Sequence, residues 1–378
     1  MAPAPSTPAP LQFAIQIGAV AEAGASDQRM YREAIADARL AQDLEFNAVW
    51  MVEHHFSDYY PTPNPLMFMS HLAAAVPGMD LGTAVMVLPW YDPVRFAEDV
   101  AMLQSLMLGG TLHLGLGRGT AKLEYDAMRV DMSEARSRFH ECWEITRLAL
   151  QGKPFTYKGR HTTIERPITV RPVVTGKMPR FYGAIGSPAT AEVMGDLGLA
   201  PLCLSQFPDY MLMKILTNWK ARAKANGFAT EGLTLPISMK CYIGDTDEGA
   251  RAEAKQYMPY FYKLQAEHYT VDSTPWKDIA GYEQFAKIFG NMKQMADPEK
   301  IGPILDRNLV GSPETVARQV NSLRALGFNY FLISNATAGV PLEVRQRMMR
   351  RFMEEVAPVV RATPADQIKP MEIKAAGV

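Results

Sequence analysis

The sequence predicts an α/β fold, a (β/α)8 TIM barrel with two insertions. An apolar strand followed by a helix recurs about eight times along the 378 residues, and 48% hydrophobic residues supply a large core. Ionisable side chains follow directly after one of these strands, as they do at the mouth of a barrel. The main alternative is an open doubly wound sheet, which usually has a glycine fingerprint after its first strand; Gly18-Ala19-Val20 does not match one.

The first half of the chain has the clearest alternation. The predicted strands are 11–17, 46–52, 80–88 and 111–116, and the predicted helices are 27–44, 65–76, 93–108 and 133–150. Asp92 before Pro93 is a typical start of a helix. A long loop is expected between 116 and 133.

The alternation is interrupted at 152–175, where prolines and glycines among short alternating segments predict a β-hairpin insertion. Further strands are then expected at 180–185, 200–205, 233–243, 308–310 and 328–334, and helices at 187–197, 209–225, 247–264, 313–326 and 341–356. The tract at about 255–301 is predicted to be an insertion or lid. The domain assignment is a flexible tail at 1–10, one catalytic barrel at 11–360 and a C-terminal tail at 361–378.

Composition excludes several classes of protein. The formal net charge is −1 and no basic stripe is present, so neither nucleic acid nor an anionic membrane surface is an expected partner. No apolar run reaches the ~20 residues of a membrane span, and the N-terminal MAPAPSTPAP lacks the features of a signal peptide. Three scattered cysteines predict a reducing, cytoplasmic location.

The most informative motif is Glu53-His54-His55, which follows the strand VWMV. Successive side chains of a strand point to opposite faces, so both histidines can face one pocket only if the strand has ended. One is expected to act in chemistry and the other to support it. HExxH spacing is absent, and no metal is predicted. A catalytic or cofactor-contacting role is favoured over a structural polar cluster.

Two further motifs are candidate anion sites. Glycines in Gly115-Leu116-Gly117-Arg118-Gly119-Thr120 allow a ligand to approach the backbone, and the guanidinium of Arg118 offers a positive charge with a forked set of donors. A plain tight turn has the same pattern. Ser187-Pro188 predicts a capped helix start, where free N–H groups can bind phosphate, with Thr190 one turn in. The segment 312–315 has the same form, and either cap could be an ordinary one.

Together these segments resemble the bacterial luciferase-like flavin-dependent monooxygenase family. The matching stretches are VWMVEHHF, GTAVMVLPWYDPVRFAEDVAML, LGLGRGTAK, DMSEARSRFHECW, AIGSPATAEVMGDLGL and NLVGSPETV. They cover most of 11–207, with weaker agreement from 308 onward.

The resemblance implies a barrel that binds reduced FMN (FMNH2) at its C-terminal mouth and reacts it with O2. It implies that His54 is the catalytic histidine, with Glu53 and His55 beside it. Ala84-Val85 matches the place of a non-prolyl cis peptide under the flavin ring.

The resemblance also assigns the cofactor's phosphate. Arg118, Ser187 and Thr190 match phosphate-holding positions, and a further arginine is either Arg136 or Arg138. In the stretch that contains Ser187, Ala184 and Gly186 are also expected to contact the cofactor.

The activity implied is two-component oxygenation of an apolar organic substrate through a flavin C4a-peroxide. A separate NAD(P)H:flavin reductase would supply FMNH2, since the chain has no nicotinamide fingerprint. A homodimer formed through the helices after strands two and three is expected. The possible cover of the site is aromatic: Tyr257, Tyr260, Phe261, Tyr262 and Trp276.

The sequence departs from the light-emitting luciferases at three positions. Gly117 stands where they have a reactive cysteine, Gly186 where they have a glutamate, and Gln206 where they have a tryptophan over the flavin. Bioluminescence is therefore not expected. Two alternatives remain: an F420-dependent dehydrogenase on the same fold, which the EHH motif disfavours, and a non-catalytic flavin-binding subunit.

Overall fold

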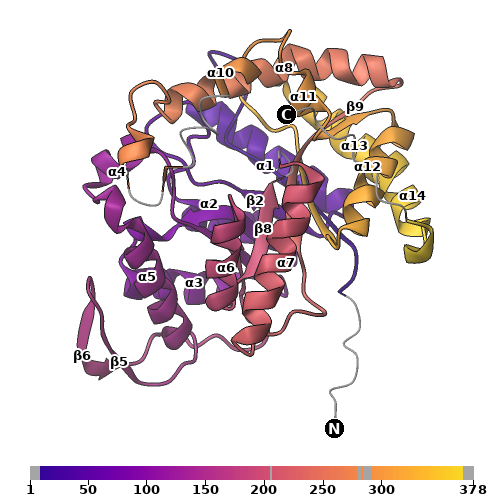
Figure 1. The fold of residues 1–378 in the computed structure, drawn as a ribbon. Helices are drawn as coiled ribbons and strands as arrows, with labels where there is room; N and C mark the ends of the chain where they lie inside the picture. The colour runs from indigo at the N-terminus through magenta and orange to yellow at the C-terminus, as the bar shows by residue number, and fades with distance from the viewer. Residues whose placement is uncertain (1–8, 205–206, 280–281, 284–291, 369–378) are drawn as a thin grey trace.

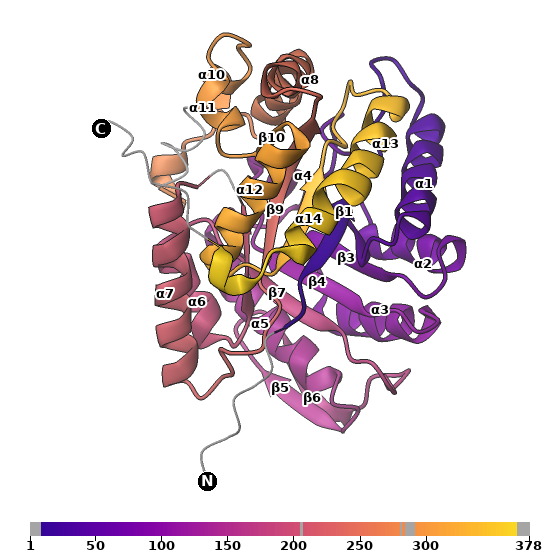
Figure 2. The ribbon, with the colours of Figure 1, turned by 90° about the vertical axis from the view of Figure 1, so that its right-hand side faces the viewer.

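The strands close into a parallel barrel surrounded by helices (Figures 1 and 2). The computed structural model describes residues 9–204, 207–279, 282–283 and 292–368. Around the ring, the eight strands are β1 (Gln12–Gln16), β2 (Ala48–Met51), β3 (Asp80–Val87), β4 (Leu112–Gly117), β7 (Arg180–Ala184), β8 (Ala200–Leu204), β9 (Pro236–Ile243) and β11 (Tyr330–Ser334). Because β8 pairs with β9 and β11 pairs with β1, the sheet closes on itself. The predicted (β/α)8 barrel is confirmed, and the doubly wound alternative is excluded.

The short strand β10 (Leu309–Gly311) lies outside this ring. It pairs with Cys241–Ile243 of β9, beyond the part of β9 that pairs with β11. The sequence correctly predicts a strand here. This strand is short and lies at the rim of the barrel.

The core has two layers. Outside the strands, one apolar cluster joins them to the surrounding helices. Inside the barrel, large aromatic side chains fill the space: Trp50 Nε1 donates a 2.9 Å hydrogen bond to Tyr330 Oη, and His113 Nδ1 lies 2.9 Å from Tyr182 Oη. These buried polar tips are therefore paired within the barrel.

Helices surround the barrel. The principal ones are α1 (Asp27–Asp43), α2 (Pro65–Ala75), α3 (Pro93–Leu106), α5 (Ala135–Ala149), α6 (Pro188–Asp196), α7 (Asp209–Ala225), α8 (Asp247–His268), α12 (Pro313–Ala325), α13 (Leu342–Arg351) and α14 (Ala357–Ala362). Short helices are α4 (Lys122–Met128), α10 (Met292–Met295) and α11 (Gly302–Leu305). Side chains accept from backbone N–H groups at the predicted caps Asp92, Ser187 and Ser312.

Two predictions about local structure were wrong. The expected long loop after β4 contains α4, whose seven residues begin without a side-chain cap and so give little signal. Helix α8 continues to His268, four residues past its predicted end and through Pro259, so the start of the predicted lid is one long helix. The β-pair β5 (Phe155–Lys158) and β6 (Thr163–Ile168) occupies the interruption after α5.

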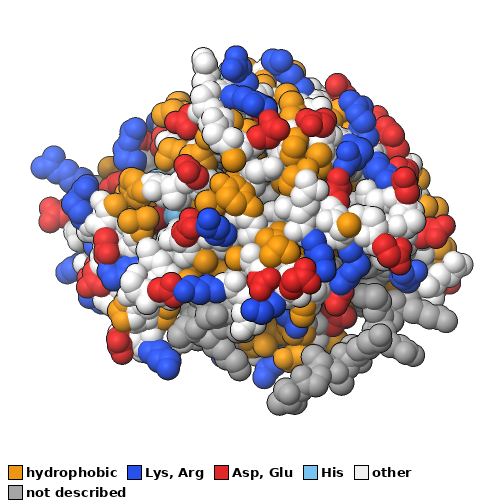
Figure 3. All heavy atoms as spheres, turned by 90° about the horizontal axis from the view of Figure 1, so that it is seen from above, with side chains coloured by type: hydrophobic (Ala, Val, Ile, Leu, Met, Phe, Trp, Pro, Cys, Tyr) orange, Lys and Arg blue, Asp and Glu red, His pale blue; other side chains and the backbone are white. Residues whose placement is uncertain are grey.

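The insertions lie at opposite ends of the barrel. In Figures 1 and 2, α8, α10 and α11 lie over one end, while β5 and β6 lie at the other. Positively and negatively charged side chains are interspersed on the end that carries α8 (Figure 3). No helix in the described part of the chain is both long and apolar enough to cross a membrane.

Candidate active site

Two neighbouring cavities are lined by residues from the carboxyl ends of the strands and from α8. The Arg118 cavity encloses about 1420 Å³ and the Lys240 cavity about 780 Å³, both including open solvent at the mouth. Six residues line both: His54, Ala84, Leu204, Ser238, Gln265 and Tyr269. The two cavities therefore meet at His54.

The side chains of Glu53, His54 and His55 lie in different environments. Strand β2 ends at Met51, so the strict alternation of a strand no longer applies at 53–55. His54 lines both cavities, whereas His55 is buried with its ring 5.3 Å from that of Trp90. Only His54 of the two histidines thus reaches the cavities.

Glu53 is a buried acceptor that ties the end of β2 to that of β3. Its Oε2 accepts from the backbone N–H of Val87 at 2.8 Å, and its Oε1 accepts from Tyr91 Oη at 2.8 Å. His55 Nε2 lies 3.2 Å from the same Oε1. Glu53 and His55 therefore fix the shape of the cavity wall beside His54.

His54 has a carboxylate partner from α4, which the sequence analysis did not identify. Its Nδ1 lies 3.3 Å from Glu124 Oε1, and the same oxygen lies 3.2 Å from Nε2 of His268 at the end of α8. Ser57 Oγ is 2.7 Å from the other ring nitrogen of His268. In the tautomer of His54 whose Nδ1–H donates to Glu124, Nε2 is unprotonated and its lone pair can accept a proton.

This arrangement sets the charges of the cluster. Burial lowers the pKa of His54, and the opposing effect of Glu124 does not overcome it, so the imidazole is neutral at pH 7. Burial would raise the pKa of Glu124, but hydrogen bonds from His268 and His54 outweigh it and lower that pKa to about 2. A neutral imidazole beside a fixed carboxylate can accept a proton and be stabilised once it is charged.

The same three side chains have the spacing of a metal site. The ligand atoms of His54, Glu124 and His268 all lie within 4.8 Å of one another. Glu124 Oε1 also accepts from the backbone N–H of His55 at 2.8 Å. These contacts place Glu124 between the two histidine rings.

Apolar residues line part of the Arg118 cavity, among them Ala84 and Val85. The Ala84–Val85 peptide is cis, as the resemblance implied, and both residues are half-buried in the wall. A Cβ on Gly117 would lie 2.5 Å from Val85 Cγ2, and one on Gly115 would lie 2.5 Å from the carbonyl oxygen of Thr83. Only glycine therefore permits this close packing of β3 on β4.

The Arg118 cavity also has polar lining residues. Arg118, Gly186 and Thr190 line it, as does Ala184, while Ser187 is buried and caps α6 by accepting from the N–H of Thr190. The Arg118 guanidinium carbon lies 4.9 Å from the centre of the Tyr282 ring. A cation thus stands beside a capped helix start, a suitable place for a bound anion.

Neither Arg136 nor Arg138 of α5 lines this cavity. Arg138 is paired with Glu134 at 2.9 Å. Arg136 is exposed. Burial is the main cause of the lowered pKa of His140, and the positive charges of Arg136 and Arg118 lower it further. Arg136 therefore lies on the same side of α5 as the Arg118 cavity.

The sequence analysis missed Glu124, His268 and Lys240. The first two depend on α4 and the end of α8, which it did not predict correctly. Lys240 had a signal, because Ser238 and Lys240 alternate with apolar residues in PISMKCYI and so share one face of a strand. Gln206 lies outside the described residues.

Known proteins resemble this chain in sequence. A model of the luciferase-like monooxygenase family matches residues 11–330. The y4vJ protein of Sinorhizobium fredii is 36% identical over 168 residues, 44% of this chain and 48% of that protein. The chain thus matches about half the length of that relative.

Solved structures share the fold. The monooxygenase RslO1 from Streptomyces bottropensis has a TM-score of 0.77 at 24% identity, covering 92% of this chain and 99% of that one. The oxygenating constituent of 3,6-diketocamphane monooxygenase from Pseudomonas putida, solved with FMN, has a TM-score of 0.71 at 18% identity, with coverage of 93% and 98%. An F420-dependent secondary alcohol dehydrogenase has a TM-score of 0.71 at 14% identity, with coverage of 93% and 99%. The match over 11–330 shows that this chain belongs to the luciferase-like monooxygenase family.

Proposed function

We propose that this protein is the oxygenase component of a two-component flavin-dependent monooxygenase that uses reduced FMN and O2. The observation that carries this proposal is the Arg118 cavity, whose lining includes apolar residues, a cation and a neutral histidine. Membership of the family supports oxidoreductase chemistry. The structure solved with FMN concerns a neighbour on the same fold.

The cavity suits a flavin in shape and polarity. The half-buried Ala84–Val85 wall, packed against the glycines of β4, can support a planar ring. Ala184 and Gly186 also line the cavity, and their small size leaves room for the chain that joins ring and phosphate.

The polar end suits the phosphate. We assign it to Arg118, Thr190 and the N–H groups at the start of α6, which Ser187 caps. Of the two arginines left open by the sequence, we assign Arg136, because Arg138 is already paired with Glu134. Arg136 is exposed, so its side chain breaks no buried contact when it meets an anion at the cavity mouth.

His54 is the proposed catalytic residue. Reduced flavin, when bound, supplies the electrons that activate O2. His54 Nε2 would accept or return a proton at the cavity, while Glu124 holds Nδ1 and stabilises the charged ring. Glu53 and His55 act as positioning residues that keep the wall in place.

Two partners follow from this proposal. A separate NAD(P)H:flavin reductase would deliver FMNH2, and an organic substrate would enter beside His54. A homodimer is supported by exposed apolar side chains on neighbouring helices α2 and α3: Met67, Met102 and Leu106, with Leu108 just after α3.

The test is anaerobic titration with reduced FMN and, separately, with reduced F420. We expect reduced FMN to bind, and Arg118→Ala to weaken binding at least tenfold, since a charged hydrogen bond is worth about 1.5–3 kcal/mol. Arg166→Ala, in the exposed part of β6, is the control. Tight binding of reduced F420 with none of reduced FMN would replace this proposal with a hydride-transfer dehydrogenase.

A second measurement separates a catalyst from a passive flavin carrier. After anaerobic loading, mixing with oxygenated buffer should oxidise the flavin at a rate that His54→Asn changes and that the exposed control His71→Asn does not. Equal rates in all three proteins would indicate a non-catalytic flavin-binding subunit.

A further inference from the structure

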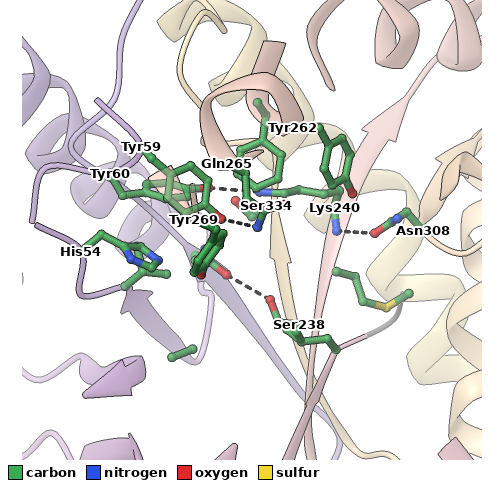
Figure 4. A pocket seen from close by; sticks show the side chains of 16 residues that line it. His54, Tyr59, Tyr60, Ser238, Lys240, Tyr262, Gln265, Tyr269, Asn308 and Ser334 are labelled. Carbon is green, nitrogen blue, oxygen red and sulfur yellow. Dashed lines mark hydrogen bonds between the residues drawn. The ribbon is translucent and has the colours of Figure 1, made fainter. Parts of the chain in front are cut away.

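Lys240 occupies an unusual place for a lysine, the inner face of a barrel strand. In β9 its neighbours Met239 and Cys241 are buried in the outer core, while Ser238 and Lys240 are half-buried and face the Lys240 cavity. Figure 4 shows Lys240 and His54 on opposite sides of this cavity, with Ser238 and Tyr269 between them. The ammonium group is thus inside the barrel mouth, next to the proposed reaction centre.

The contacts of this ammonium group are neutral. Nζ donates a 3.1 Å hydrogen bond to Tyr60 Oη, which itself donates to the carbonyl oxygen of Ala336 at 2.8 Å. Nζ also lies 4.0 Å from the centre of the Phe261 ring. An aromatic face stabilises a cation but does not neutralise it.

No carboxylate among the described lining residues balances this charge. Among the described residues that line the Lys240 cavity there is no aspartate, glutamate or arginine. The other ionisable groups facing it, from the loop after β2 and from the end of α8, are His54, Tyr59, Tyr60, Tyr262 and Tyr269. All are neutral at pH 7, because burial lowers the pKa of the histidine and raises the pKa of each tyrosine.

A cation without a counter-charge is costly to hold away from water. Burial accordingly lowers the pKa of Lys240 to about 7, so the free protein holds it partly charged at neutral pH. A bound anion would supply the missing charge and favour the protonated form. The cavity is therefore electrostatically incomplete without such a ligand.

We propose that the Lys240 cavity binds the carboxylate of an organic-acid substrate, with Lys240 as its counter-charge. Ser238 lines the same cavity, with its hydroxyl donating to Gln16 Oε1 at 3.0 Å, and Phe261 offers apolar contact. Because His54 lines both cavities, a molecule held by its carboxylate at Lys240 extends toward His54 and the Arg118 cavity. This orientation rests on the proposed function, whereas the carboxylate site itself needs no flavin.

The test uses the full-length protein without flavin, so its result is independent of the proposed function. Calorimetric titrations compare benzoate with benzamide and octanoate with octanamide, pairs of similar shape that differ in charge. We expect each carboxylate to bind at least tenfold more tightly than its amide. Lys240→Met should remove that preference, while Lys263→Met, an exposed lysine of α8, should keep it.

Proton uptake gives a readout that a purely structural role of Lys240 would not produce. With a free pKa of about 7, Lys240 is mostly neutral near pH 8, so an ion pair with a carboxylate draws up to about 0.9 proton from the buffer. Titrations in buffers of different ionisation enthalpy measure this number. Lys240→Arg, which is always protonated, should bind the carboxylates with no proton uptake.

Three results would overturn the proposal. The first is equal binding of carboxylate and amide by the wild-type protein. The second is a preference for carboxylates that Lys240→Met leaves unchanged. The third is covalent trapping of a carbonyl compound on Lys240 by borohydride, together with no carboxylate preference, which would make Lys240 a nucleophile rather than a counter-charge.

Discussion

Arg345 joins the last helices of the barrel to the first, and its removal should destabilise the whole fold. The side chain on α13 is 1% exposed. Its Nε donates to Asp37 Oδ2 and its Nη2 to Glu33 Oε2, both at 2.9 Å, while Nη1 donates to the carbonyl oxygen of Val340 at 2.8 Å. Asp37 and Glu33 belong to α1, so these bonds link segments about 300 positions apart.

Arg345→Met would leave two carboxylates buried without a cation. Breaking a buried ion pair in this way costs about 3–5 kcal/mol. The lower part of that range is expected, because Glu33 keeps Arg29 at 2.6 Å and because burial, which raises the pKa of Asp37, already disfavours its charged form. With an unfolding entropy of about 2.1 cal/mol/K per residue, or ~0.8 kcal/mol/K here, the expected drop in Tm is about 4 °C.

Differential scanning calorimetry at pH 7 measures this change. The matched control is Arg347→Met on the same helix, whose guanidinium is 49% exposed and paired with Glu253; an exposed pair is worth about 0–1 kcal/mol. Adding Asp37→Asn and Glu33→Gln to Arg345→Met should recover at least half of the lost stability. A Tm for Arg345→Met equal to that of the control would refute the reasoning.

Other predictions concern the site. Gly117→Ala should weaken binding of reduced FMN at least tenfold, because the new Cβ would press on the stiff side chain of Val85. Gly302→Ala, where a Cβ would have nothing within 4 Å, should leave binding unchanged. Equal affinities of the two variants in a fluorescence titration would contradict the proposed ring site. The Glu124 pKa of about 2 lies below its unfolded value, so its stabilisation is present above about pH 4.5 and is lost as pH falls toward 2. Urea midpoints should therefore fall less steeply over that range in Glu124→Gln than in the wild-type protein, and parallel curves would argue against the effect. Chelation with EDTA should leave flavin binding and oxidation unchanged, since Glu124 Oε1 already accepts from the backbone N–H of His55 and lies 3.3 Å from His54 Nδ1. Loss of activity restored by a divalent metal would show that the cluster is a metal site.

Local patterns were sufficient for most of the architecture. The alternation of apolar strands and capped helices depends on residues within one or two turns, and so Asp92, Ser187 and Ser312 marked their helices correctly. The same patterns failed at α4, which has no side-chain cap and is too short for a clear periodicity.

The sequence could not show which side chain of Glu53-His54-His55 faces the cavities and which ones support it. Which histidine faces the cavities depends on the end of β2 at Met51 and on partners far along the chain, Tyr91 and Glu124. The choice between Arg136 and Arg138 likewise rests on the ion pair of Arg138 with Glu134.

The sequence by itself determined the barrel, its family and the segments that form the mouth, because these depend on short-range periodicity and on motifs that are read in order along the chain. Only the tertiary structure decided which side chains share a cavity and at what charge. His268 meets His54 across more than 200 residues, and Lys240 has a low pKa because of what surrounds it. Burial and pairing are properties of the closed barrel, and no local stretch of sequence contains them.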